Sequence, residues 1–335
     1  MERREFLKAT GAAAGVALAS RALGAQEKGR KDMIWANLLH LSLNMWCDWD
    51  NPDGRESYTN RSPDLRFDEP MWNEILPAMT GAGMNMVIID LGDGVQYESH
   101  PEIAVKGAWS RDKLRDELAK LRKMNLEPIP KMNFSATHDT WLGPYSHCVS
   151  SEKYYTVCKE LISEAVALFD KPRFFHLGMD EEGEECQRSY EYAVIRQHDL
   201  WWRDFYFLVD QVEKGGSRAW IWSDYLWGHK ELFLKKMPKT VVQSNWYYGT
   251  KFDKSERAVE AYSDLADNGY DQVPTGSNWS SPECFGLTVD YCVKNIPREK
   301  LLGFMQTPWK ATLTKFRQRH LDAIEQVKQS QAKLI

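Results

Sequence analysis

Residues 173–182 read RFFHLGMDEE, a short run of apolar and aromatic residues that ends in three carboxylates. Such a run is typical of a buried β-strand, and the polar residues mark where the strand ends. Comparable runs recur along the chain, and each is followed by a segment with helical periodicity. The predicted strands lie at residues 34–47, 84–93, 126–135, 173–182, 217–227, 240–249, 270–279 and 301–309.

Helical patterns fill the intervals between these strands. They lie at residues 68–83, 110–125, 150–171, 198–214, a short segment ending near Pro238, 254–268, 286–296 and 311–333. Strands that alternate with helices imply a parallel sheet covered by helices. The chain therefore predicts an α/β fold, a (β/α)₈ TIM barrel that forms a single domain over residues 33–335. A doubly wound open sheet is the alternative, but no GxGxxG or GxxxxGK[ST] motif follows a strand.

The N-terminus has the composition of an export signal. Arg3 and Arg4 precede a weakly apolar, alanine-rich run, and small residues follow near residues 22–25. We predict that residues 1–25 are a signal peptide resembling the twin-arginine type, with the twin-arginine export machinery as partner and a periplasmic or secreted location. A short amphipathic helix is the alternative. The apolar stretch is too short to cross a bilayer, and no later segment is long enough for an integral membrane span.

Composition narrows the class of ligand. The net charge of −5 offers no electrostatic basis for binding nucleic acid or an anionic membrane. Aromatic residues are abundant, with 14 Trp, 14 Tyr and 13 Phe. Six cysteines show neither a CxxC pair nor zinc-ligand spacing, so one or two disulfides are possible but their connectivity cannot be predicted.

The carboxyl ends of the strands, where barrel enzymes hold their active sites, are rich in tryptophan and carboxylates. Indole faces suit the C–H faces of sugar rings, and polar side chains suit the hydroxyls, so these ends predict a carbohydrate substrate. The predicted substrate-binding residues are Asp90, His138, Trp141, His176, Trp222, Asp224, Trp246, Tyr247, Trp279 and Trp309.

Alternation along the strand at 173–182 places His176, Gly178 and Asp180 on one face, toward the barrel interior. Glu181 follows at the strand end and can also turn over the mouth. Glu182 and the two glutamates after it are expected to be solvated loop charges. His176 is expected to be a hydrogen-bonding support below the site. The cluster lacks a second histidine at ligand spacing, so we predict neither a metal nor a cofactor.

HLGMDE at residues 176–181 resembles the His-x-Gly-x-Asp-Glu signature of family 20 glycoside hydrolases, the β-N-acetylhexosaminidases. Residues 127–141 are similar to that family's third-strand segment, and RAWIWSDYLW, PKTVVQSNWYY and GFMQTPW resemble its fifth, sixth and eighth strands. The resemblance implies that Asp180 orients and polarises the 2-acetamido group of the substrate, which acts as nucleophile. It implies that Glu181 protonates the leaving oxygen, the substrate-assisted variant of glycoside hydrolysis.

The chain departs from the family's pattern at several positions: His138 is displaced in its local pattern, and no clear arginine ends the first strand. Lys131 and Asn133 stand where the family usually has acidic residues, and Lys310 stands where it has an acidic clamp for hydroxyls. These departures leave the sugar preference open. Two other functions remain alternatives, a carbohydrate-binding barrel without turnover and a metal-dependent sugar isomerase or epimerase. For the hydrolase, a neighbouring carboxylate and a desolvated cleft predict a raised pKa for Glu181.

Overall fold

The computed structural model describes residues 33–46, 60–188 and 196–334. Its strands form one parallel sheet in the order β6-β5-β4-β3-β2-β1-β8-β7. They are β1 (Ile34–His40), β2 (Met86–Asp90), β3 (Glu127–Lys131), β4 (Phe174–His176), β5 (Arg218–Trp222), β6 (Val242–Ser244), β7 (Thr275–Gly276) and β8 (Gly303–Gln306). Main-chain hydrogen bonds from Val273 to Gln243 (2.9 Å) and from Thr275 to Asn245 (2.9 Å) join β6 to β7. The sheet therefore closes, and the predicted (β/α)₈ barrel is confirmed.

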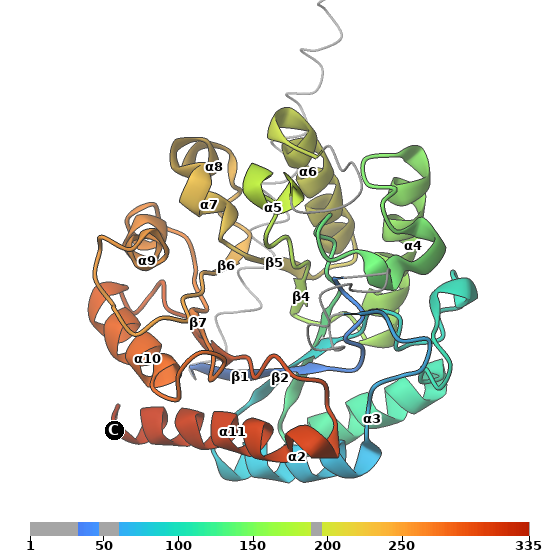
Figure 1. Cartoon of the computed structure of the whole chain (residues 1–335), viewed down its shortest axis with the longest axis horizontal. Coiled ribbons are helices and arrows are strands. Elements are labelled where there is room, and N and C mark those ends of the chain that lie inside the picture. Colours follow the sequence, from blue (N-terminus) through green and yellow to red (C-terminus); the bar gives the residue numbers. More distant parts are fainter. Residues whose placement is uncertain (1–32, 47–59, 189–195, 335) are drawn as a thin grey trace, which may run out of the picture. The chain divides into compact units, whose positions relative to one another are not determined.

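Helices lie outside the strands (Figure 1). The longer ones are α2 (Glu69–Gly81), α3 (Arg111–Lys123), α4 (Glu152–Leu168), α6 (His198–Lys214), α9 (Arg257–Asp267), α10 (Cys284–Asn295) and α11 (Arg317–Ala332). Shorter helical segments are α5 (Glu184–Arg188), α7 (Tyr225–Gly228), α8 (Lys230–Lys236), η2 (Pro101–Ile103), η3 (Thr140–Tyr145) and η4 (Thr314–Phe316). Ser110 and Ser151 cap α3 and α4 by accepting the main-chain N–H three residues on.

The first and last helices of the described residues meet, which completes the outer ring of the barrel. Helices α2 and α11 lie side by side (Figure 1), and the Gln331 amide donates to the carbonyl of Ala82 at 2.9 Å. Inside the ring, alternate strand residues form the inner core, from Ile34, Ala36 and Leu38 on β1 to Met305 on β8. This alternation is the period-two pattern of strands buried on both faces.

The strands are shorter than the sequence predicts. Strand β4 ends at His176, and Gly178 and Met179 then take positive φ values of 76° and 74°. The predicted alternation through Asp180 is therefore wrong beyond His176, because the chain has already left the strand. This early turn places the acidic residues on a loop above the barrel.

Three further predictions are tested only in part, or not at all, by the described residues. Residues 1–32 lie outside the described residues, so the signal peptide stays a prediction. No helix within the described ranges is long and apolar enough to cross a membrane. Cys148, Cys158, Cys284 and Cys292 are free thiols.

Candidate active site

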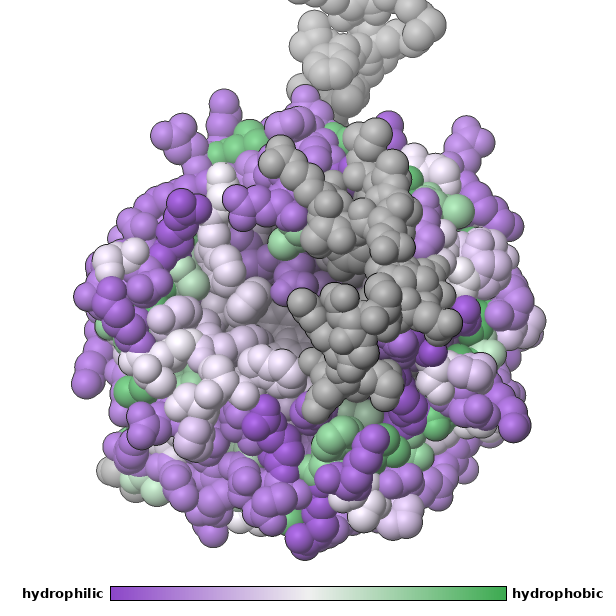
Figure 2. All heavy atoms as spheres, viewed as in Figure 1, coloured by the Kyte–Doolittle hydropathy of each residue, from purple (hydrophilic) through white to green (hydrophobic). Residues whose placement is uncertain are grey.

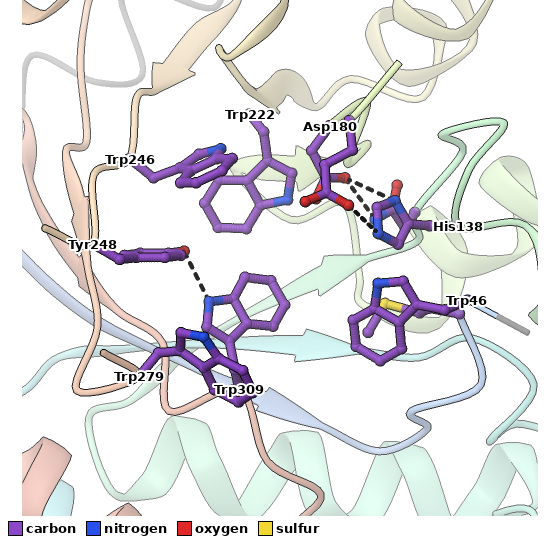
Figure 3. A pocket seen from close by; sticks show the side chains of 11 residues that line it. Trp46, His138, Asp180, Trp222, Trp246, Tyr248, Trp279 and Trp309 are labelled. Atoms are coloured by element: carbon purple, nitrogen blue, oxygen red, sulfur yellow. Dashed lines mark hydrogen bonds and ion pairs between the residues drawn. The ribbon is translucent and has the colours of Figure 1, made fainter. Parts of the chain in front are cut away.

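A cavity of about 370 Å³ opens where the loops after the strands converge. The face of the barrel in Figure 2 is hollowed at its centre, inside the ring of helices. Figure 3 shows tryptophans and a tyrosine around one part of the cavity, with Asp180 and His138 opposite. The lining residues are Met45, Trp46, Asn133, His138, Asp180, Glu181, Trp222, Trp246, Tyr248, Trp279 and Trp309. The volume and the largely aromatic lining suit a small ligand such as a sugar ring.

The loop that carries the acidic pair is held by Asn133, which follows β3. The Asn133 amide donates to Oδ1 of Asp180 at 2.9 Å, and its Oδ1 accepts the N–H groups of Ser135 (3.0 Å) and Met179 (3.3 Å). Gly178 packs directly against this amide, since a Cβ there would lie 1.9 Å from the Asn133 oxygen. The positive φ and this close approach together require glycine at residue 178.

His138 lies between the two acidic side chains. Its Nδ1 is 3.6 Å from Oδ1 of Asp180, and its Nε2 is 3.3 Å from Oε2 of Glu181. Burial alone would lower the pKa of His138, but the charges of Asp180 and Glu181 outweigh it and raise the pKa to about 9. The imidazole is therefore protonated at neutral pH and forms ion pairs with the acidic residues.

The contact with His138 shifts the pKa of Glu181 in the direction opposite to the one predicted. The hydrogen bond from His138 lowers the pKa of Glu181 below its ordinary value, although burial opposes it. The predicted raised pKa is wrong for this arrangement, because a cation and not a carboxylate is the dominant neighbour of Glu181. The Glu181 side chain is 46% exposed, so solvent and any ligand in the cavity can reach it.

Asp224, after β5, is a carboxyl beside Glu181 whose pKa is raised. Burial, followed by the charge of Asp180, raises the pKa of Asp224 to about 8. Its Oδ2 accepts the main-chain N–H of Glu181 at 2.8 Å, and its Oδ1 accepts the indole N–H of Trp246 at 3.3 Å. Asp224 does not belong to the cavity lining, but it touches two residues that do.

Aromatic side chains from the end of β5 and from the loops after β6 and β8 form a continuous wall. Trp222 and Trp309 have ring centroids 5.9 Å apart, and Trp246 stacks on Tyr248 at 5.0 Å. The Trp309 indole donates to the Tyr248 hydroxyl at 2.8 Å (Figure 3). Trp279 lies at the outer edge of this wall and is 41% exposed.

Four other predicted substrate-binding residues lie outside the lining. Trp141 is buried and donates to the carbonyl of Asn133 at 2.7 Å. His176 lies below Trp222, with ring centroids 4.6 Å apart, which matches a supporting position. Asp90 forms a buried pair with Lys131 at 2.5 Å, inside the barrel. Tyr247 packs on Phe252 instead of the cavity.

Several lining residues were not predicted as binding residues. Tyr248 takes the place expected for Tyr247, and Asn133, Trp46 and Met45 complete the lining. A strand-end position was the available signal for Asn133 and Trp46. Glu182, expected to be solvated, is instead buried, where it pairs with Arg196 and accepts the Trp201 indole N–H at 2.8 Å. Within the described ranges, no group of three or more His, Cys, Asp or Glu residues is arranged to hold a metal ion.

Fold and cavity together define a (β/α)₈ barrel with an aromatic-walled, acidic pocket at the carboxyl ends of its strands. No protein-family model matches the chain, and no curated protein matches it. Solved structures do match.

A mutant Streptomyces plicatus β-hexosaminidase in complex with the product GlcNAc has 13% identity and a TM-score of 0.60 over 88% of this chain and 64% of its own. The GH20 exo β-N-acetylglucosaminidase of Vibrio harveyi with N-acetylglucosamine has 12% identity and a TM-score of 0.57, covering 91% of this chain and 57% of its own. The β-N-acetylhexosaminidase of Bacteroides fragilis has 13% identity and a TM-score of 0.57, covering 88% and 65%.

This chain thus spans about three fifths of the length of these proteins. At such identities the likeness establishes the fold, a barrel like that of family 20 glycoside hydrolases.

Proposed function

We propose that this protein is an exported glycoside hydrolase that cleaves β-linked N-acetylhexosamine residues by a substrate-assisted mechanism. The observation that carries the proposal is the pair Asp180 and Glu181, joined by His138, at the edge of a tryptophan-walled cavity. The barrel shared with β-N-acetylhexosaminidases supports it. Export rests on the signal predicted in residues 1–25.

In this mechanism Asp180 accepts the N–H of the substrate's 2-acetamido group. The acetamido oxygen then attacks C1 as the bond from C1 to the leaving oxygen breaks, and Glu181 supplies the proton that the leaving oxygen needs. Water, deprotonated by Glu181, opens the resulting cyclic intermediate at C1. The product therefore keeps the anomeric configuration of the substrate.

His138 and Glu181 share the proton that the leaving oxygen receives. With the pKa of His138 raised and that of Glu181 lowered, the proton resides on the imidazole before substrate binds. Nε2 of His138 passes this proton to the carboxylate of Glu181, 3.3 Å away, and Glu181 passes it on to the leaving oxygen, which leaves His138 neutral and Glu181 ionised. His138 then stands ready to accept a proton when water attacks.

The cavity wall suits the acetamido group. Trp222 is buried and its indole N–H has no hydrogen-bond partner among the described residues, which leaves a donor for a ligand oxygen. Tyr248 accepts the N–H of Trp309 and lies 3.5 Å from the Thr307 hydroxyl, so its O–H can donate to Thr307 or turn to a ligand oxygen. The faces of Trp222 and Trp309 offer apolar contact to a methyl group or a sugar ring.

The test compares aryl glycosides that differ in leaving group and in the 2-substituent. Glu181→Gln should slow hydrolysis of unactivated β-N-acetylhexosaminides by roughly two to four orders of magnitude. It should slow nitrophenyl substrates much less, because nitrophenolate needs little protonation. Asp180→Asn should slow both kinds.

Substrates with a 2-hydroxyl in place of the acetamido group should be poor. Their equal turnover would refute substrate assistance. Binding of N-acetylhexosamine with no hydrolysis of any aryl glycoside would instead favour a carbohydrate-binding barrel.

A further inference from the structure

Asp224 stands directly before α7 and has both carboxyl oxygens engaged within the site. One oxygen accepts the main-chain N–H of Glu181 at 2.8 Å, and the other accepts the indole N–H of Trp246 at 3.3 Å. The two donors come from different parts of the barrel, the loop after β4 and the loop after β6. A single side chain in the loop after β5 therefore bridges the loops that follow β4 and β6.

The hydrogen bond to Asp224 stabilises an unfavourable main-chain conformation of Glu181. Glu181 has a φ of 54°, in the left-handed region that costs an L-residue about 1 kcal/mol or more. The hydrogen bond from its N–H to Asp224 helps hold that conformation, and the conformation decides where the half-exposed carboxylate points. His138 meets the carboxylate end of the same residue at 3.3 Å.

The second hydrogen bond of Asp224 fixes the orientation of Trp246, which forms part of the cavity wall. Trp246 packs edge-on against Trp227 at 4.6 Å and stacks on Tyr248 at 5.0 Å, and its indole N–H points to Asp224. Rotating this indole would break its hydrogen bond and move the surface that a sugar would touch. The acid and part of the sugar platform thus depend on the same carboxyl.

We propose that Asp224 is a positioning residue that fixes the placement of the acid Glu181 and of the Trp246 wall together. The inference rests on the proposed function, which makes Glu181 the proton donor. Asp224 itself need not touch the substrate, since both of its oxygens are occupied and it does not line the cavity. Its effect reaches the reaction through Glu181 and Trp246.

The isosteric variant Asp224→Asn tests this geometry. An amide has one acceptor oxygen, so it can serve Glu181 or Trp246 but must turn its NH₂ group toward the other N–H donor. We expect kcat to fall about 10- to 100-fold, as for a small misplacement of a catalytic group, with the KM of a nitrophenyl β-N-acetylhexosaminide changing less than kcat. Glu184→Gln is the matched control, because this carboxylate begins the adjacent short helix α5 and pairs with His229 outside the cavity lining.

Trp246→Phe supplies a rescue that a merely structural role would not produce. Phenylalanine keeps an aromatic ring but removes the indole N–H, so in the double variant the one acceptor oxygen of the new amide is free to serve Glu181. Asp224→Asn should therefore lower kcat by less than about fivefold in the Trp246→Phe background, well below its effect alone. Equal losses in both backgrounds, or a kcat within about threefold of wild type for Asp224→Asn, would overturn the proposal.

A crystal structure of Asp224→Asn separates this inference from the proposed function. Displacement of the Glu181 main chain or of the Trp246 indole supports the positioning role, even if the wild type hydrolyses no aryl glycoside. An unchanged left-handed Glu181 and an unmoved Trp246 would refute it, whatever the activity. Absence of hydrolysis by the wild type, with displacement in the variant, would count against the proposed function alone.

Discussion

Replacing Gly178 with alanine should damage both stability and activity, and the structure allows the cost to be worked out. The φ of 76° costs an L-residue about 1–2 kcal/mol. The new Cβ would lie 1.9 Å from Oδ1 and 2.8 Å from Cα of Asn133, so rotating the amide cannot relieve the clash. Moving Asn133 puts at risk its three hydrogen bonds to Asp180, Ser135 and Met179, each about 1 kcal/mol. The expected loss is about 4 kcal/mol.

Urea unfolding of Gly178→Ala against the wild type measures this loss. Gly183→Ala, in the same loop, is the control, because no atom lies within 4 Å of the added Cβ and its φ is not positive. The control should stay within about 1 kcal/mol of the wild type. Gly178→Ala should also lower kcat at least about tenfold, since Asp180 loses its orienting donor. A free energy of unfolding within about 1 kcal/mol of the wild type would show that the loop relaxes, and the reasoning from the close approach to Asn133 would fail.

Three further predictions concern other parts of the chain. The pKa of His138 is raised, so its ion pairs stabilise the fold fully below about pH 6.5, and this stabilisation is lost as the pH rises through about 9. The difference in unfolding free energy between the wild type and His138→Gln should therefore shrink by about 3 kcal/mol from about pH 6 to about pH 10. Denaturant titrations at these two pH values measure the difference, and an unchanged difference would contradict the raised pKa. Arg196→Met leaves Glu182 buried without its guanidinium partner and should cost about 3–5 kcal/mol in chemical unfolding, whereas a cost below about 1 kcal/mol would mean that the carboxyl is protonated and tolerated there. Changing Arg3 and Arg4 to lysine should trap precursor inside the cell, which fractionation and immunoblotting detect; undiminished export would exclude the twin-arginine route.

The barrel could be predicted because each unit carries its own signal. Strand runs with period two alternate with helical segments, and serine caps such as Ser110 and Ser151 mark helix starts. What could not be predicted is where each strand stops. At β4 the apolar pattern continues through Leu177 and Met179, yet the strand ends at His176 because the contact between Gly178 and Asn133 turns the chain. That contact joins residues far apart in sequence, so no local pattern contains it.

Tertiary contacts, which no local pattern contains, also decide which of the predicted site residues line the cavity. Trp222, which ends β5, faces the cavity as its strand position predicts. Tyr247 and Tyr248 are neighbours of the same type beyond the end of β6, where alternation no longer specifies direction, and only Tyr248 lines the cavity. Trp141 belongs to the same predicted rim, but its indole is used to fix the loop at Asn133. Composition at a strand end thus predicts that a site exists there, and tertiary contacts decide which side chains face it.

The pKa values of the acidic residues also depend on tertiary contacts. Adjacent carboxylates at residues 180 and 181 predict that one must have a raised pKa, and that reasoning holds for the cluster but names the wrong member. His138 approaches Glu181 and lowers its pKa, while Asp224, which is buried and faces the charge of Asp180, has the pKa raised to about 8. The repulsion is therefore relieved at Asp224, the carboxyl of the three that has no cationic partner among the described residues. With that proton on Oδ1 of Asp224, Oδ2 still accepts the main-chain N–H of Glu181, so the cluster loses one negative charge while the contact that places the acid is kept.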